Sequence, residues 1–147
     1  MTNWISKTFT ELTPDELYKI FQLRAEVFIV EQNCAYLDFD DKDQHSIHLG
    51  LWQDNKLLAY SRILPPGLAY DQPSIGRICT SMSVRKTGSG RELVKKSIEV
   101  IYKLYGEQPI KISAQFYLKK FYESFGFQTK GEIYLEDFID HIAMIKP

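Results

Sequence analysis

The sequence predicts one mixed α/β (α+β) domain over residues 1–147, with a mostly antiparallel central sheet and flanking helices. Three observations predict this fold. Two apolar or alternating runs, His48–Gln53 and Lys56–Leu64, are joined by the turn signal Asp54-Asn55, which is typical of an antiparallel hairpin. A strand–helix–strand crossover follows, and such a crossover makes its two strands parallel. The chain ends in a second antiparallel pair, expected at Gly131–Leu135 and Ile139–Ile145.

The first elements are an edge strand, expected at Trp4–Phe9, and a helix that begins after Thr13. Thr13-Pro14-Asp15-Glu16 combines an N-cap, a proline at the first helical position and a capping-box glutamate. Apolar residues then recur at helical spacing as far as Phe28, with Arg24 interrupting the stripe. Two readings of Arg24 stay open: a guanidinium paired with an acid such as Glu31, or one that faces a cleft.

A long segment, Glu31–Ser46, has mixed polarity and no period, so a loop is expected there. It is either a functional loop or a solvated acidic one. Its cluster Asp40-Asp41-Lys42-Asp43 lacks the glycine and the final glutamate of a calcium loop, and we expect no metal site.

The crossover is expected to consist of a central strand, a helix, a short strand and an aromatic helix. Their ranges are Ser74–Val84, Arg91–Tyr105, Ile110–Ala114 and Tyr117–Phe125. The inward stripe of the first helix is expected to be Val94, Ile98, Ile101 and Tyr105. The strands that end near Val84 and Ala114 should therefore be parallel neighbours.

The turn between that strand and that helix is a candidate anion site. Gly88 and Gly90 permit positive φ and close approach of a ligand, and the free amides of a helix N-terminus favour phosphate. Arg85, Lys86 and Arg91 add positive charge. The turn is neither a P-loop nor a G-x-G-x-x-G motif, because no Lys-Ser, Lys-Thr or third glycine follows in register.

Composition narrows the class of protein. Hydrophobic residues make up 44% and charged residues 25% of the chain, as in ordinary globular proteins, and the net charge of −1 argues against a nucleic-acid binder. No apolar run is long enough to span a membrane, and Cys34 and Cys79 have no C-x-x-C spacing, so we expect a cytoplasmic protein. The acidic segment and the basic turn suggest two ligands of opposite charge.

Three motifs together resemble the GCN5-related N-acetyltransferases (GNAT). They are R-x-x-G-x-G from Arg85, the F-Y-x-x-F-G-F run from Phe121, and the Leu23–Gln32 pattern together with Ile75-Gly76-Arg77, which is similar to the ElaA-type branch. The resemblance implies a splayed parallel strand pair, acetyl-CoA as co-substrate and direct N-acetyl transfer to a primary amine of a small molecule or peptide. No metal is implied.

The resemblance also implies residue roles. The backbone of Ile78, Cys79 and Thr80 would pair with the pantetheine arm. The loop Arg85–Arg91 would hold the pyrophosphate; its residues are Arg85, Lys86, Thr87, Gly88, Ser89, Gly90 and Arg91. Lys86 departs from the pattern, because the family often has glycine there. Tyr122 would protonate the leaving thiolate as general acid, although its spacing from Leu118 also fits simple core packing.

The general base is left open, because no acidic residue lies on Ser74–Val84. The candidates are Glu31, Asp40, His48 and His141, with Glu31 also a candidate substrate contact. Candidate substrate-binding residues are Arg24, Asp40 and His48. The acidic segment around Glu31–Asp43 suggests a cationic acceptor.

Two rival functions remain at the level of sequence. One is a ping-pong acyltransferase that uses Cys34 as nucleophile, with His45 or His48 as base. The other is an acyl-CoA-binding interaction module without turnover. The oligomeric state is also open, with a homodimer as one option.

Overall fold

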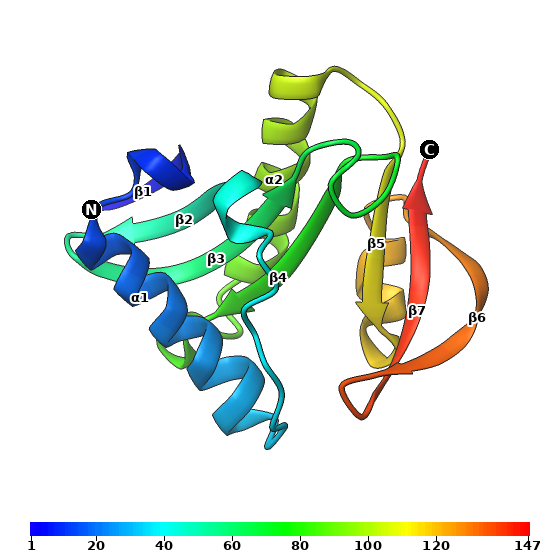
Figure 1. Ribbon diagram of the computed structural model, residues 1–147, viewed down its shortest axis with the longest axis horizontal. Coiled ribbons are helices and arrows are strands. Elements are labelled where there is room, and N and C mark those ends of the chain that lie inside the picture. Colours follow the sequence, from blue (N-terminus) through cyan, green and yellow to red (C-terminus); the bar gives the residue numbers. More distant parts are fainter.

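The computed structural model describes residues 1–147 as two antiparallel sheets with helices packed around them (Figure 1). The first sheet has the order β1-β2-β3-β4 and the second the order β5-β7-β6. The strands are β1 (Thr2–Thr8), β2 (Ile47–Gln53), β3 (Lys56–Leu64), β4 (Ser74–Thr80), β5 (Ile110–Gln115), β6 (Gln128–Glu136) and β7 (Ile139–Lys146). The helices are α1 (Pro14–Arg24), α2 (Ser89–Tyr105) and α3 (Lys119–Glu123). The predicted mixed, mostly antiparallel fold is confirmed.

β4 and β5 run in the same direction and diverge (Figure 1). Where they begin, the amide of Lys111 donates a hydrogen bond of 3.1 Å to the carbonyl of Pro73. Further along, β4 pairs with β3 and β5 pairs with β7, so a gap opens between the two sheets. The splayed parallel pair is therefore confirmed, and the facing edge of β4 has no partner strand along its second half.

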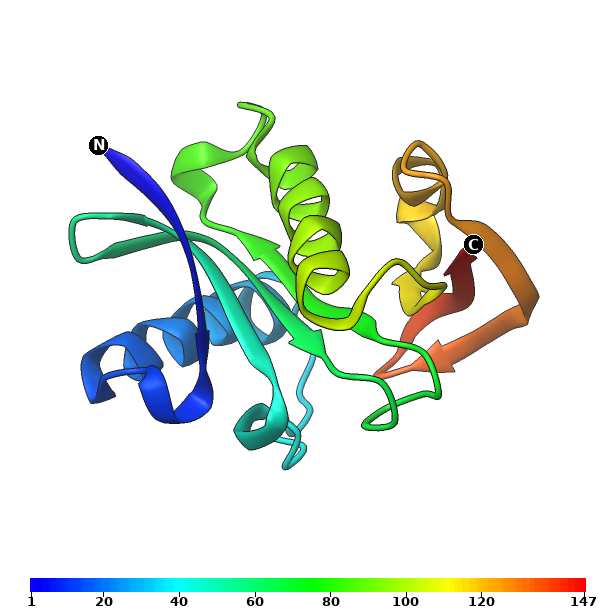
Figure 2. The ribbon, with the colours of Figure 1, turned by 90° about the horizontal axis from the view of Figure 1, so that it is seen from above.

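The core has two parts because helices cover both faces of the first sheet (Figure 2). On one face, α2 buries Val94, Ile98 and Ile101 in a cluster that also includes residues of β5 and β7, so the core is continuous between the two sheets. On the other face, α1 contributes Ile20 and Leu23 to a smaller cluster. The predicted stripe of α2 is confirmed for its buried members, whereas Tyr105 is only partly buried.

Several element boundaries differ from the predictions. The strand expected to reach Val84 ends at Thr80, because the Ser81 hydroxyl accepts a hydrogen bond from the Ser83 amide and starts a 3-10 turn, Met82–Val84. The aromatic helix is split into a 3-10 turn, Phe116–Leu118, and α3. After Arg24 the first helix continues as a π-helical segment, η2 (Ala25–Glu31). The expected loop follows, with one 3-10 turn, η3 (Asp43–His45).

Candidate active site

The turn that precedes α2 has the backbone of an anion site. Gly88 is the N-cap with φ of 88° and no side-chain cap, and the first bond of the helix runs from the Glu92 amide to the Gly88 carbonyl at 3.1 Å. The amides of Ser89, Gly90 and Arg91 precede that bond and are therefore free to bind a ligand. A Cβ at Gly90 would meet no atom within 4 Å, so no other segment packs against this position. The pyrophosphate site at this turn stays a prediction.

Lys86 has a φ of 64°, in the left-handed region that favours glycine. This conformation explains why a related loop would carry glycine at the position. Lysine keeps the same backbone shape at some cost in strain, and it adds a cation next to the free amides.

Two arginines of the turn are already engaged by protein groups. Arg85 pairs with the carboxylate of Glu31, with Nη2 to Oε2 at 2.7 Å, and donates to the Thr80 carbonyl at 3.1 Å. Arg91 donates to the Ser124 hydroxyl at 3.0 Å and lies over the Phe125 ring, so it ties α2 to the segment that follows α3. In this state the free amides, more than the guanidinium groups, are available for a phosphate.

The Arg85 guanidinium also lowers the pKa of Glu31 below its usual range by donating hydrogen bonds to the carboxylate. A carboxylate held in this way accepts a proton less readily. The arrangement gives no support to Glu31 as general base.

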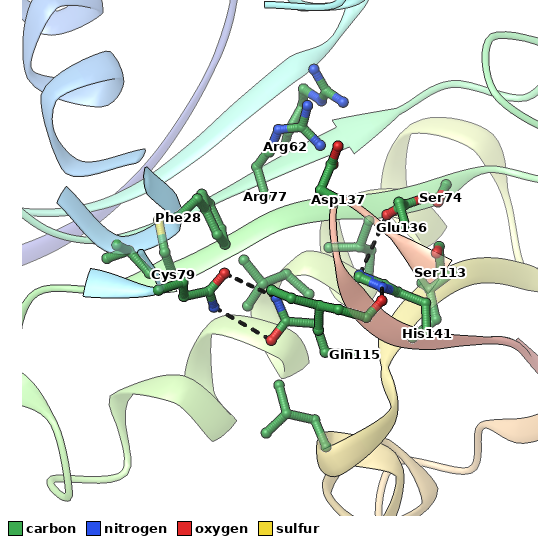
Figure 3. A pocket seen from close by; sticks show the side chains of 18 of the residues that line it. Phe28, Arg62, Ser74, Arg77, Cys79, Ser113, Gln115, Glu136, Asp137 and His141 are labelled. Atoms are coloured by element: carbon green, nitrogen blue, oxygen red, sulfur yellow. Dashed lines mark hydrogen bonds and ion pairs between the residues drawn. The ribbon is translucent and has the colours of Figure 1, made fainter. Parts of the chain in front are cut away.

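A cavity of about 950 Å³ occupies the gap between the sheets. β4 forms one wall with Ser74–Thr80, and side chains of β5 and β7 face it from the second sheet (Figure 3). The lining also includes parts of the π-helical segment, the loop that follows it, the β3–β4 connection, the region of α3 and the β6–β7 turn. Gln115 and Gln32 bridge β5 to the end of η2 by amide hydrogen bonds of 3.3 and 3.4 Å. Arg85 reaches the cavity, and the rest of the anion turn lies outside its lining.

The residues predicted to pair with the pantetheine arm line the cavity. Ile78, Cys79 and Thr80 form the end of β4 and line the cavity on its open edge. Backbone groups at such an edge can pair with an extended ligand as a further strand would. Cys79 is buried, and burial raises the pKa of its thiol, so it is not a thiolate at neutral pH.

Tyr122 packs in the core and also borders the cavity. Its ring is part of the main core cluster, with 6% of the residue exposed, and it stands edge-on to Phe121 and Phe127. The same residue lines the cavity. Burial raises the pKa of its hydroxyl, which therefore keeps its proton at neutral pH. The general-acid role stays a prediction.

The structure places Arg24 and His48 in a buried network. Arg24 is fully buried; its Nε and Nη1 donate to Asp38 and Asp43 at 2.8 Å each. His48 is 2% exposed, with its ring nitrogens 2.6 Å from the Tyr60 hydroxyl and 2.9 Å from the Asp43 carbonyl. Neither side chain has surface for a substrate, which corrects the prediction that they bind one. The alternative reading of Arg24 as a buried arginine paired with an acid is confirmed, but the acids are Asp38 and Asp43 and not Glu31.

The same network neutralises the acidic loop. Arg62 binds Asp40 through two bonds of 2.8 Å and Asp43 at 3.0 Å, and Arg77 binds Asp38 at 2.7 Å. These ion pairs lower the pKa of Asp40 and of Asp43 although burial opposes the shift. Asp40 lines the cavity, but its engaged carboxylate is a poor proton acceptor. The acidic loop is thus no free anionic surface, contrary to the basis of the cationic-acceptor prediction.

Cys34 has no histidine partner. Its thiol donates to the backbone carbonyl of Asp137 at 2.7 Å, which ties the loop to the β6–β7 turn. His48 has both ring nitrogens engaged elsewhere, and His45 lies exposed on η3. The geometry therefore provides no activated Cys–His pair and speaks against the ping-pong mechanism.

Known proteins resemble this one in sequence and in fold. A family model described as an acetyltransferase (GNAT) domain matches residues 10–147. The chain belongs to the GNAT acetyltransferase family. ElaA of Escherichia coli is 37% identical over 99% of this chain and 97% of its own, and its crystal structure superposes with a TM-score of 0.92. An acyl-CoA N-acyltransferase from Pseudomonas aeruginosa is 39% identical, with a TM-score of 0.95 and full coverage of both chains.

A UPF0039 protein of Synechocystis is also similar, with 40% identity over 97% of this chain and 94% of its own length. These relatives support the ElaA-type branch of the GNAT superfamily, and family membership supports acyl-CoA-dependent N-acyltransferase activity in general. No helix of this GNAT protein combines the length and the apolar character that crossing a membrane requires.

Sequence reasoning missed part of the GNAT cavity. Arg77 entered only as part of the Ile75-Gly76-Arg77 motif, with no role of its own. Arg62 was not singled out, although an arginine inside the apolar run Lys56–Leu64 is a signal for a buried ion pair. Glu136 was missed too, and its carboxylate lies 3.4 Å from Nε2 of His141 (Figure 3). A strand pairing that spans the β6–β7 turn was the available clue, since it brings β6 side chains next to those of β7.

Proposed function

We propose that this protein transfers an acetyl group from acetyl-CoA to a primary amine of a small molecule or peptide by direct attack. The observation that carries the proposal is one cavity lined by the end of β4, by Arg85 of the anion turn and by Tyr122. The free amides at the start of α2 follow Arg85 within six residues. Acetyl-CoA needs a site for its diphosphate, an edge for its extended arm and a cavity for its thioester.

In this proposal the turn and β4 bind different parts of acetyl-CoA. The amides of Ser89, Gly90 and Arg91 bind the pyrophosphate, and Lys86 contributes charge. The backbone of Ile78–Thr80 orients the arm along β4. Orientation of thioester and amine in one cavity supplies much of the rate enhancement, because it replaces a bimolecular encounter.

Tyr122 is proposed to protonate the sulfur as the carbon–sulfur bond breaks. Its raised pKa makes it a weak acid, but it ensures that the proton is present throughout the neutral range.

The acceptor is proposed to be a cationic amine, and the basis is now a pair of carboxylates at the β6–β7 turn instead of the acidic loop. The acidic loop is neutralised, but Glu136 and Asp137 line the cavity without a lysine or arginine partner. These carboxylates at the β6–β7 turn attract an ammonium group.

The test combines binding and turnover. At a concentration one hundred times its dissociation constant, acetyl-CoA should raise the free energy of unfolding by about 2.7 kcal/mol. A panel of primary amines, read by mass spectrometry, should then show a product heavier by one acetyl group. The absence of any stabilisation by millimolar acetyl-CoA would refute the binding assignment. Stabilisation without transfer to any amine would favour the alternative of a non-catalytic acyl-CoA-binding module.

A further inference from the structure

His141 lies on β7 with one imidazole nitrogen fixed and the other facing a carboxylate. Nδ1 is 2.7 Å from the backbone oxygen of Ile139, and because a carbonyl can only accept, this nitrogen carries the hydrogen. In the neutral ring Nε2 is therefore unprotonated. The ring is held in place by stacking on Tyr134, with centroids 6.1 Å apart, and only 6% of His141 is exposed.

Nε2 lies 3.4 Å from Oε2 of Glu136, and both residues line the cavity (Figure 3). A proton that arrives at Nε2 is stabilised by this negative charge, as a carboxylate stabilises the imidazolium of hydrolytic triads. The side chain of Glu136 is 48% exposed, so the pair keeps contact with solvent and the proton can leave.

We propose that His141 is the general base for the acceptor amine and that Glu136 is a positioning residue which stabilises the protonated ring. The inference deepens the proposed acetyl transfer and rests on it. Among the four bases that the sequence allowed, His141 alone lines the cavity with a nitrogen that is not already engaged by a hydrogen-bond donor. Glu31 and Asp40 are held by arginines, and both nitrogens of His48 are occupied.

The ammonium of the acceptor gives one proton to Nε2, and the resulting amine attacks the thioester carbon. The carbon–sulfur bond breaks, and the sulfur takes a proton from the Tyr122 hydroxyl. The former amine nitrogen then gives up its remaining excess proton, which reprotonates the Tyr122 phenolate. His141 then releases its proton to solvent. Ammonium and thioester become amide, thiol and one proton.

The groups around His141 define the pH test. Glu136 and Tyr134 face it from β6, and the residue opposite on β5 is the uncharged Gln115. Across the cavity lie Arg77, Asp40, and the Arg85–Glu31 pair, each engaged in an ion pair, and the protonated Tyr122. Asp137 lies at the turn. Among the groups adjacent to the ring, Glu136 is the one that carries charge at neutral pH.

The experiment compares single-turnover rates of the parent, His141→Gln, Glu136→Gln and Asp140→Asn from pH 5 to pH 9 with an amine that the parent acetylates. Asp140 is the matched control, because it lies next to His141 on the same strand but is exposed. We expect His141→Gln to lower the rate by roughly a hundredfold to ten-thousandfold, with acetyl-CoA affinity within a few fold of the parent. The rate of Glu136→Gln should lie between those of the parent and His141→Gln, and the rate of Asp140→Asn should match that of the parent.

The profile against pH separates a base from a packing residue. The parent rate should rise with pH and level off, whereas His141→Gln should lose the plateau and keep rising with the fraction of free amine. Added imidazole should partly restore His141→Ala. A parent-like rate and profile in His141→Gln would overturn the inference, as would loss of acetyl-CoA binding in that variant. If the parent binds acetyl-CoA yet acetylates no amine, the proposed function fails as well, and that outcome is visible before any variant is made.

Discussion

Tyr122 shows at the scale of one residue how packing and chemistry can share a side chain. Its ring is fixed by aromatic neighbours, while the residue borders the cavity. Such rigidity is useful for a general acid, because the hydroxyl does not need to be ordered during the reaction. The two readings of the sequence were therefore not exclusive, and only the role of the hydroxyl remains to be tested.

Tyr122→Phe removes that hydroxyl and preserves nearly all the volume of the ring. We expect single-turnover acetyl transfer to fall by roughly a hundredfold to ten-thousandfold, because positioned proton donation is lost. Acetyl-CoA affinity should stay within a few fold, and stability should change by at most about 1 kcal/mol. The control is Tyr18→Phe, since Tyr18 is 70% exposed on α1 and lies outside the cavity lining. If Tyr122→Phe retains the parent rate across the pH range, another group protonates the sulfur.

Arg24 marks the limit of sequence reasoning at this scale. Its place on the apolar stripe indicated an unusual role, and pairing with an acid was one of the two readings. Several acids lie within the next twenty positions, and which of them reach Arg24 depends on the path of the irregular loop before it enters β2. No local pattern encodes that path, so Glu31 was as plausible a partner as Asp38.

At the scale of elements, the strand–turn–helix unit was predictable because its signals are local. Two glycines, flanking cations and helical periodicity lie within a few residues of one another. The early end of β4 was not predicted, because the apolar character of the chain continues through Met82 and Val84 while a serine hydroxyl redirects the backbone. The π-helical turns of η2 escaped prediction for a similar reason, since their side-chain pattern still resembles that of an α-helix.

Gly90→Val tests the anion turn more cleanly than Gly88→Val. Gly88 has a positive φ, so a valine there strains the backbone, whereas Gly90 has no such requirement and its Cβ would point into open space. We expect Gly90→Val to leave the free energy of unfolding unchanged or raised by up to about 1 kcal/mol, because glycine is a poor helix former. Acetyl-CoA affinity, measured by titration calorimetry, should fall at least about tenfold, since the side chain occupies the space of the ligand.

Gly90→Ala is the matched control for size, with an expected loss of affinity between those of the parent and the valine variant. Parallel losses of stability and affinity would show that Gly90 is needed for the turn itself. An unchanged acetyl-CoA affinity in Gly90→Val would show that the pyrophosphate does not bind at this position.

At the scale of the whole molecule, two sheets separate on one side of their junction and the ion-pair network braces the first of them. The network joins α1 through Arg24, the loop through Asp38, Asp40 and Asp43, β3 through Arg62 and β4 through Arg77. Hairpin pairing and helix packing were predicted because turn residues and periodicity specify them. The network and the cavity depend on contacts between segments that are distant in the sequence. The sequence therefore predicted the fold but not which side chains line the cavity.

Asp43 is the member of this network whose loss should matter most for stability. Its carboxylate is 6% exposed and bonds both Arg24 and Arg62, at 2.8 and 3.0 Å. Asp43→Asn leaves two buried guanidinium groups undercompensated, and breaking a buried pair costs about 3–5 kcal/mol. Asp41→Asn is the matched control, because Asp41 is exposed and forms no ion pair. Denaturant unfolding at pH 7 should show a loss for Asp43→Asn and almost none for Asp41→Asn.

The same pair of variants predicts a dependence on pH. The pKa of Asp43 is lowered in the folded state, so its contribution is present above the ordinary aspartate pKa of about 3.9 and is lost as the pH falls through the folded value. Burial also lowers the pKa of His48, so parent and variant alike should lose stability as the pH falls below about 6.5. The difference between parent and Asp43→Asn largely removes that shared loss. Because the Asp43 carboxylate also raises the pKa of His48, the difference can change between pH 7 and pH 5, and the diagnostic range lies lower. Below about pH 4 the difference should shrink, as the parent carboxylate becomes protonated. A difference that does not shrink there would contradict the assignment of Asp43 as an ionised partner of the two arginines.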